Sequence, residues 1–265
     1  MTILDSNNSI GFFDSGVGGL TVLSKVKKLL PYEKFIFYGD TAHVPYGDKT
    51  KSQLLEYSDN ILKFFEKKGC KAVVMACNTT SSVIFDDING RYNFKLYPVV
   101  QSVAKVLAGF NVDRLGVFAT KATIESGAYS KEIAKYNPEM KVFGQFCENW
   151  VHIVENNLQN QPESVAIVKS DLEKMLENDV QKIVLGCTHY PFLTNILSRF
   201  VPRDMFIDPA DYLAEFIKND LATCGLLSDG SSFGEEFYVS ANPSQFKKSA
   251  QLFYELKAEP NLLNF

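Results

Sequence analysis

The sequence VVMACNTT at residues 73–80 has a close counterpart in IVLGCTHY at residues 183–190. Each segment is an apolar run followed by a small residue, a cysteine and a polar turn. Such a run is typical of a buried parallel strand that ends where a helix begins. We therefore expect Cys77 and Cys187 each to lie at the carboxyl end of a strand, which is where open α/β sheets bind their ligands.

Each cysteine segment is preceded by a second apolar element, at residues 10–15 and 115–120. The two halves of the chain therefore look like copies of one another. Short apolar runs also alternate with longer segments of helical periodicity, which is typical of βαβ units. The sequence therefore predicts an α/β fold of two pseudo-symmetric, doubly wound lobes with largely parallel sheets and an active site between them. We assign residues 1–97 plus 210–265 to the first lobe and residues 98–209 to the second.

The hydrophobic pattern also predicts the individual elements. Strands are expected at residues 35–38, 72–76, 96–100, 115–119, 141–146 and 183–186, and helices at residues 18–30, 51–68, 123–135 and 162–177. The tail has a helix pattern at residues 211–221, a strand pattern at 236–240 and a helix pattern at 244–256. We expect this tail to return to the first lobe.

Composition and charge narrow the class of ligand. The 265 residues carry a formal net charge of −4, which gives no electrostatic reason to bind nucleic acid or an anionic membrane, so a small molecule is the favoured ligand. Residues 1–10 lack the charged and apolar regions of a secretory signal, and no apolar run approaches the roughly 20 residues of a membrane span. We expect a cytoplasmic protein. Its five cysteines include no Cys-x-x-Cys pair, so neither disulfides nor a metal site are expected.

A glycine-rich turn, DSGVGG at residues 14–19, follows a strand pattern and opens a helix pattern. Its backbone amides could hold an anion, but it matches neither the P-loop nor the dinucleotide-binding motif. It is equally typical of a tight strand-to-helix connection in which Asp14 or Ser15 caps the helix. In both interpretations the Asp14 carboxylate lies near the strand ends, where it could orient a protonated amine or a thiol.

The two matched thiols suggest a reaction class. A free cysteine usually behaves as a small buried hydrophobe, but an approximate twofold axis would turn Cys77 and Cys187 toward each other. Two like groups on opposite faces of one carbon can remove a proton from one face and deliver a proton to the other, which inverts a stereocentre. Because only about 3% of a thiol is ionised at pH 7, neighbours such as His189 and Asp14 must tune the pair. The cysteines without matched context, interpreted as structural, are Cys70, Cys147 and Cys224.

Further motifs complete the pattern. They are DSGxGG at residues 14–19, YGD at 38–40, VPYG at 44–47, ACNT at 76–79, TxxTxxSxxY at 120–129 and GCTHYP at 186–191. In this order they resemble the glutamate racemases of the aspartate/glutamate racemase superfamily, over residues 10–246. The resemblance implies an isomerase without a cofactor that interconverts L- and D-glutamate and supplies D-glutamate for peptidoglycan synthesis. We also expect a homodimer, although the sequence does not identify its interface.

The resemblance also carries roles to matching positions. Cys77 would be the base that acts on D-glutamate and Cys187 the base that acts on L-glutamate, each serving as the acid in the other direction. Asp14, Glu155 and His189 would assist them. Hydroxyls, amides and loop N–H groups can hold the substrate without a cluster of arginines. The substrate-binding positions are Asp14, Ser15, Pro45, Tyr46, Gly47, Cys77, Asn78, Thr79, Thr80, Thr120, Thr123, Cys187, Thr188 and His189, with Ser126 as a further lining candidate.

One segment departs from the family pattern, and three alternatives stay open. Before Glu155 the family usually has two prolines, whereas residues 147–155 read CENWVHIVE, so the backbone there is expected to be less constrained. The reaction type also fits a racemase of aspartate or a hydantoin. A thiol hydrolase with Cys187 as nucleophile and His189 as base is less favoured, because side chains two residues apart near a strand end are expected to point apart. A binding module for an acidic amino acid would hold its ligand without exchanging hydrogen.

Overall fold

The structure of the protein is a computed structural model that describes residues 4–231 and 233–265. The expectation about the first ten residues therefore falls partly outside the described residues. The strands are β1 Ile10–Asp14, β2 Lys34–Gly39, β3 Ala72–Met75, β4 Lys95–Pro98, β5 Arg114–Ala119, β6 Lys141–Phe146, β7 Lys182–Gly186, β8 Phe206–Ile207, β9 Gly234–Val239 and β10 Asn261–Leu262.

The described strands form two sheets in which every pairing is parallel. The first sheet has the order β10-β9-β2-β1-β3-β4 and the second has the order β6-β5-β7-β8. If β5, β6, β7 and β8 are matched to β1, β2, β3 and β4, the order of the second sheet repeats the last four strands of the first, β2-β1-β3-β4. The predicted α/β fold of two pseudo-symmetric lobes with parallel sheets is confirmed.

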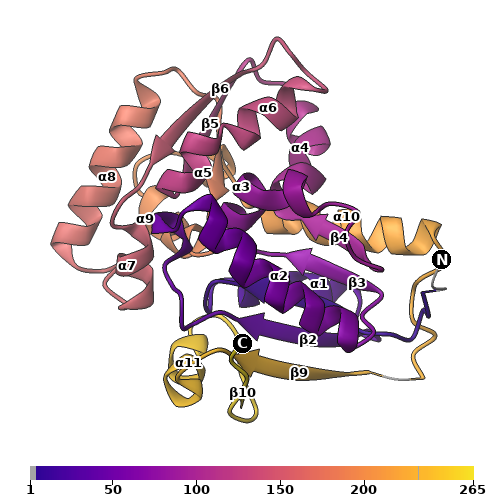
Figure 1. The fold of residues 1–265 in the computed structure, drawn as a ribbon. Coiled ribbons are helices and arrows are strands. Elements are labelled where there is room, and N and C mark those ends of the chain that lie inside the picture. Colours follow the sequence, from indigo (N-terminus) through magenta and orange to yellow (C-terminus); the bar gives the residue numbers. More distant parts are fainter. Residues whose placement is uncertain (1–3, 232) are drawn as a thin grey trace.

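Helices cover the faces of both sheets, and their bounds follow the amphipathic segments of the sequence (Figure 1). The central strands are buried along their whole length, as expected for parallel sheets covered on both faces. The α-helices are α1 Leu20–Leu29, α2 Lys51–Lys67, α3 Asn78–Ile88, α4 Val99–Ala108, α5 Lys121–Ser126, α6 Ala128–Ala134, α7 Trp150–Glu155, α8 Pro162–Leu176, α9 Thr194–Leu197, α10 Pro209–Thr223 and α11 Pro243–Ala250. The 3₁₀ helices are η1 Tyr46–Asp48, η2 Tyr190–Leu193 and η3 Arg203–Met205.

The described residues form three buried apolar clusters, and one of them spans both lobes. Helix α4 packs against α6 and α10, and α10 packs in turn against α1, so apolar side chains run without a break from one sheet to the other. The cluster includes Phe12 of the first sheet and Val117 of the second. Burial of this kind stabilises the fold by about 25 cal/mol for each Å² of apolar surface removed from water. This continuous packing fixes the strand ends of the two sheets relative to each other.

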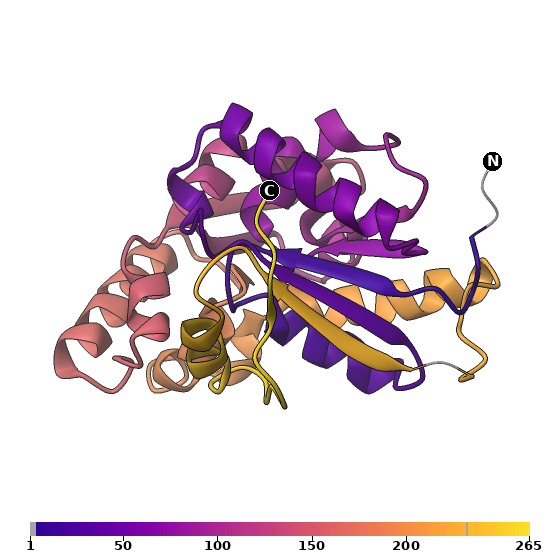
Figure 2. The same ribbon diagram turned by 60° about the horizontal axis from the view of Figure 1, so that its bottom comes forward.

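The C-terminal tail lies along the first sheet, although it is the last part of the chain. Strand β9 pairs in parallel with β2, with Phe37 opposite Phe237, and β10 pairs with the end of β9. Figure 2 shows β9 beside β2, with the final segment of the chain crossing nearby. The tail therefore supplies the outer strands of the sheet that carries the first thiol.

Three predicted elements differ from the structure. Val99 and Val100 begin helix α4 rather than ending strand β4, because they pack into the core shared by the lobes. The helix expected at residues 123–135 is two helices, since Gly127 between them has a φ of 63° that ends a right-handed helix. The last predicted helix stops at Ala250 instead of Leu256. No helix in the described part of the chain has the length and apolar character needed to cross a bilayer.

Candidate active site

The carboxyl ends of β1, β3, β5 and β7 meet at one small cavity of about 40 Å³. Its position follows from the fold, because the ends of parallel strands gather at one edge of a sheet and the two sheets face each other there. The lining residues are Asp14, Ser15, Val44, Pro45, Tyr46, Gly47, Cys77, Asn78, Thr79, Thr120, Val151, Cys187, Thr188 and His189.

Both matched thiols line this cavity. Cys77 is 6% exposed and Cys187 is 7% exposed, so each is buried except where it faces the cavity. Cys77 is the residue before helix α3, as the sequence predicts. Cys187 does not begin an α-helix; it is followed by a turn and the 3₁₀ helix η2. The duplication therefore extends to the positions of the thiols but not to the elements that follow them.

The Asp14 carboxylate is buried at the end of β1. Its Oδ2 accepts hydrogen bonds from the backbone N–H groups of Gly16, at 3.2 Å, and Gly19, at 3.0 Å. Its Oδ1 has no hydrogen-bond partner within the residues that the structure describes. Burial raises the pKa of Asp14, although the nearby charge of His189 acts in the opposite direction. The carboxylate thus both closes the glycine-rich turn and leaves one acceptor free for another group.

His189 connects a thiol to a carboxylate. Its Nδ1 lies 3.8 Å from Cys187 Sγ, and its Nε2 lies 3.1 Å from Glu155 Oε1. The expectation that Cys187 and His189 point apart is wrong, because the turn after β7 brings both side chains to the same side. Burial by itself lowers the pKa of His189, but the bonds to Cys187 and Glu155 outweigh it and raise this pKa to about 10. His189 is therefore a cation at neutral pH.

Helix α7 holds Glu155 in place without the two prolines. The indole of Trp150, at the start of this helix, is fully buried between Phe118 and Tyr190. Its Nε1 also donates a hydrogen bond of 2.9 Å to Asp171 Oδ2 in helix α8. These contacts fix the helix by packing, so the absent prolines are not needed to bring Glu155 to His189.

The two thiols have different surroundings. Burial, followed by the nearby Asp14 carboxylate, raises the pKa of Cys77 to about 12, so Cys77 is protonated at neutral pH. Cys187 has the His189 cation as its neighbour. The site therefore holds one protonated thiol beside a carboxylate and one sulfur beside the His189 imidazole.

Hydroxyl and amide groups form the rest of the wall. Thr79 Oγ1 and Thr120 Oγ1 lie 2.9 Å apart, which joins the two lobes, and Thr120 Oγ1 lies 3.0 Å from Thr123 Oγ1. Asn78 accepts a hydrogen bond from the Tyr129 hydroxyl at 2.8 Å. Of the predicted substrate-binding residues, Thr80 and Thr123 are not part of the lining: Thr80 donates its hydroxyl hydrogen to the carbonyl of Cys77.

Two apolar lining residues, Val44 and Val151, do not appear in the sequence prediction. Val44 precedes the predicted Pro45, and Val151 lies in helix α7 near Glu155. Val44 begins the VPYG motif, but neither valine has a polar or titratable side chain that would mark it as a site residue. Val151 does lie in the segment at residues 147–155, which the sequence singles out because it departs from the family pattern.

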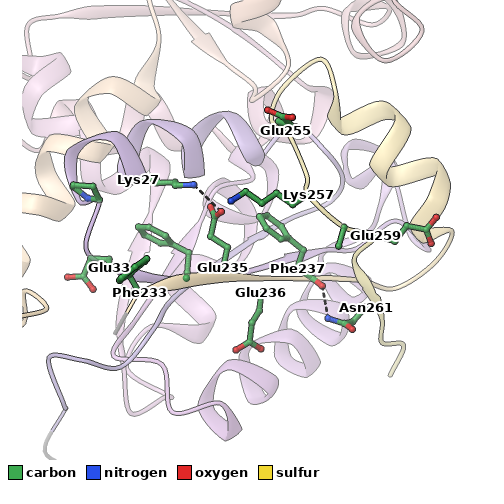
Figure 3. Close-up of a pocket in the computed structure, with 14 residues that line it drawn as sticks. Lys27, Glu33, Phe233, Glu235, Glu236, Phe237, Glu255, Lys257, Glu259 and Asn261 are labelled. Atoms are coloured by element: carbon green, nitrogen blue, oxygen red, sulfur yellow. Dashed lines mark hydrogen bonds and ion pairs between the residues drawn. The ribbon is translucent and has the colours of Figure 1, made fainter. Parts of the chain in front are cut away.

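A larger cavity lies elsewhere, lined by residues of helix α1, strands β2 and β9 and the segment at residues 255–261 (Figure 3). It measures about 520 Å³ and contains an ion pair of 3.0 Å between Lys27 and Glu235. Glu33, Glu235, Glu236, Glu255 and Glu259 line it, against Lys27 and Lys257. This excess of carboxylates disfavours an acidic ligand, so we place the site at the strand ends despite the smaller space there.

Comparison with known proteins gives consistent results. The family model described as Asp/Glu/Hydantoin racemase matches residues 29–217. The glutamate racemase of Carboxydothermus hydrogenoformans is 38% identical over 245 residues, which cover 92% of this chain and 91% of the relative. The crystal structure of the glutamate racemase from Thermus thermophilus, in complex with β-chloro-D-alanine, superimposes with a TM-score of 0.89 at 33% identity and 98% coverage of both chains. That of the Francisella tularensis glutamate racemase, in complex with D-glutamate, has a TM-score of 0.88 at 29% identity and the same coverage.

Proposed function

The chain belongs to the Asp/Glu/hydantoin racemase family, and from this premise we propose that it interconverts L- and D-glutamate with Cys77 and Cys187 as the acid and base. The observation that carries the proposal is that both thiols, one from each lobe, line the same buried cavity. A hydrolase would need one nucleophile, and a binding protein would need none. The names of the similar proteins favour glutamate as the substrate over aspartate or a hydantoin.

The conversion of L-glutamate to D-glutamate uses the two thiols in opposite roles. The thiolate of Cys187, next to the His189 cation, removes the α-proton of L-glutamate and becomes a thiol. Cys77 gives its proton to the opposite face of the α-carbon and becomes a thiolate. The product is D-glutamate, and solvent must exchange protons with both sulfurs before the next turnover in the same direction. In the reverse direction Cys77 is the base and Cys187 is the acid.

The polar wall supplies the binding groups. Asp14 Oδ1, which lacks a partner within the described residues, is an acceptor for the ammonium group of the substrate. The carboxylates can accept hydrogen bonds from the hydroxyls of Thr79 and Thr120 and from the amide of Asn78, which come from both lobes. Binding from two sides would fix the α-carbon between the sulfurs.

By this function the enzyme would supply D-glutamate for peptidoglycan synthesis, as the family resemblance implies. The expected homodimer and the cytoplasmic location remain predictions.

Hydrogen exchange tests the proposed function. Either enantiomer of pure glutamate, incubated with the protein in deuterium oxide, should yield the other enantiomer with deuterium at the α-carbon. The double variant Cys77→Ala/Cys187→Ala should show neither inversion nor exchange. Cys70→Ala is a matched control, because Cys70 is equally buried, precedes the same strand β3 and does not line the cavity. Inversion that survives in the double variant would contradict the mechanism, and a wild-type protein that inverts aspartate but not glutamate would contradict the substrate.

A further inference from the structure

We propose that Asp40 is a positioning residue for this reaction: its carboxylate holds the loop at residues 41–47 so that Tyr46 and Gly47 are fixed against Cys77. The inference rests on the proposed function and assigns a task to a side chain that does not line the cavity. Asp40 directly follows strand β2 and is only 2% exposed. Burying a carboxyl group destabilises the fold unless hydrogen bonds satisfy its oxygen atoms, and both oxygens of Asp40 have such partners.

Both oxygens of the Asp40 carboxylate are occupied by side chains from two distant segments. Oδ2 accepts a hydrogen bond of 2.5 Å from the Tyr46 hydroxyl, and Oδ1 accepts one of 2.7 Å from the Ser240 hydroxyl. The Nδ1 atom of His43 lies 2.9 Å from each oxygen. Hydrogen bonds to an ionised acceptor are about twice as strong as those between neutral groups. The carboxylate is therefore the common acceptor of the loop and the tail.

Further bonds tie the loop to the tail at the same place. Thr41 and Ala241 exchange two hydrogen bonds through the threonine hydroxyl, at 2.5 and 2.9 Å, and the N–H of Ala42 donates to Ser240 Oγ at 2.8 Å. The ring of His43 stacks on Tyr57 of helix α2, with the centroids 3.8 Å apart. The start of the loop is thus held against the residues that follow β9, so the distant tail helps to position this loop.

The far end of the loop forms one wall of the site. Residues 44–47 all line the cavity with Cys77, and the ring of Tyr46 is fully buried in the same hydrophobic cluster as that thiol. A Cβ atom at Gly47 would lie 3.3 Å from Thr120 Cβ, so the loop touches the second lobe at its end. Between Asp40 and this contact, the Tyr46 hydroxyl is the bond that fixes the ring. Loss of the carboxylate should therefore displace the wall of the site while leaving both thiols in place.

The variant Asp40→Asn tests the inference with little change in volume. An amide offers one acceptor oxygen where three donors now converge, so at least one of them loses its bond. We expect KM for both enantiomers of glutamate to rise about tenfold, because a misplaced binding wall weakens contacts with the substrate. Since the interconversion of two enantiomers has an equilibrium constant of one, kcat/KM must fall by the same factor in both directions. This equality checks the consistency of the measured constants.

Glu33→Gln is the matched control. Glu33 precedes β2 as Asp40 follows it, is 3% exposed, and accepts hydrogen bonds from Lys71 and from the N–H of Ser228, far from the loop. Its loss should lower the melting temperature without changing KM. The melting temperatures of both variants, measured in the same buffer, separate a general loss of stability from a specific loss of substrate contacts.

Ser240→Ala keeps the test decisive if Asp40→Asn does not fold, because it removes a single donor from the carboxylate and leaves the buried charge with its other partners. We expect a rise in KM of about threefold, with kcat changed less than KM. Values of KM within twofold of the wild type in the folded variants, together with a lowered melting temperature, would overturn the inference and leave Asp40 a structural residue. An inactive wild-type protein would instead overturn the proposed function, and the inference with it.

Discussion

A methyl group at Gly18 should disable the site by moving His189. Gly18 lies in the glycine-rich turn before helix α1, where a Cβ atom would stand 2.6 Å from His189 Cε1 and 2.2 Å from Thr188 Oγ1. Ordinary contacts begin at 3.4 Å, so in Gly18→Ala the imidazole must move by about 0.8 Å. Its nitrogens now lie 3.8 Å from Cys187 Sγ and 3.1 Å from Glu155 Oε1, and the ring cannot keep both contacts after such a shift.

The size of the effect follows from this displacement. A misplacement of about 1 Å in a catalytic group can cost about 10²-fold in rate. We therefore expect Gly18→Ala to lose about 10²-fold in kcat/KM, equally for L- and D-glutamate, and to lose about 1–3 kcal/mol of stability from overpacking. Initial rates of racemisation from each enantiomer, monitored by circular dichroism, give kcat/KM. Urea unfolding gives the loss of stability.

The same substitution two residues earlier is the control. A Cβ atom at Gly16 would meet nothing closer than Glu155 Oε1 and Val44 Cγ2, both at 3.9 Å, so Gly16→Ala should keep kcat/KM within about threefold. The reasoning is refuted if folded Gly18→Ala has the wild-type rate. It is refuted equally if the two alanine variants lose the same activity, because the effect would then come from the flexibility of the turn and not from the imidazole.

Three other outcomes are expected. Cys77→Ser and Cys187→Ser should each reduce racemisation by more than 10²-fold in a steady-state assay, because a hydroxyl is a far weaker acid than a thiol and a far poorer base than a thiolate; a wild-type rate in either would exclude that residue as a proton carrier. The pKa of His189 is higher in the folded protein, at about 10, than its usual 6.5, so the stability that its protonation adds is fully present below pH 6.5 and lost as the pH rises through 10. The stability advantage of the wild type over His189→Gln, from urea midpoints, should shrink between pH 7 and 10, and an advantage that grows would contradict the ion pair. Lys71→Met should cost about 3–5 kcal/mol of unfolding free energy, because it leaves the Glu33 carboxylate buried without its cation; a loss below about 1 kcal/mol would show that water reaches it.

The sequence was most informative where a reactive side chain directly follows an apolar run typical of a buried strand. The thiol segments end buried strands, so their place at the sheet edge could be predicted from the pattern alone. The strand prediction failed at Val99, where β-branched residues favour a strand but the core between the lobes makes the residue helical. The helix prediction failed at Gly127, because a single residue with positive φ interrupts an otherwise continuous periodicity.

Only those residues of the site that belong to recognisable motifs could be predicted from the sequence. Its polar lining follows from the family resemblance, but the contact between His189 and Cys187 depends on the path of a turn that no periodicity describes. Asp40 illustrates the same limit, since its partner Ser240 lies 200 positions away in the chain and becomes a neighbour only when β9 pairs with β2. Contacts of this kind arise from tertiary structure and leave no local signal.

The most direct test of the two-thiol account is α-hydrogen exchange by each single variant with each pure enantiomer in deuterium oxide, followed by NMR. Cys77→Ala retains only the sulfur on the Cys187 side, so it should exchange the α-hydrogen of L-glutamate with retention of configuration and leave D-glutamate untouched. Cys187→Ala should do the reverse, and neither should racemise. Exchange of the same enantiomer by both variants, or inversion by either one, would contradict the claim that the sulfurs serve opposite faces of one carbon.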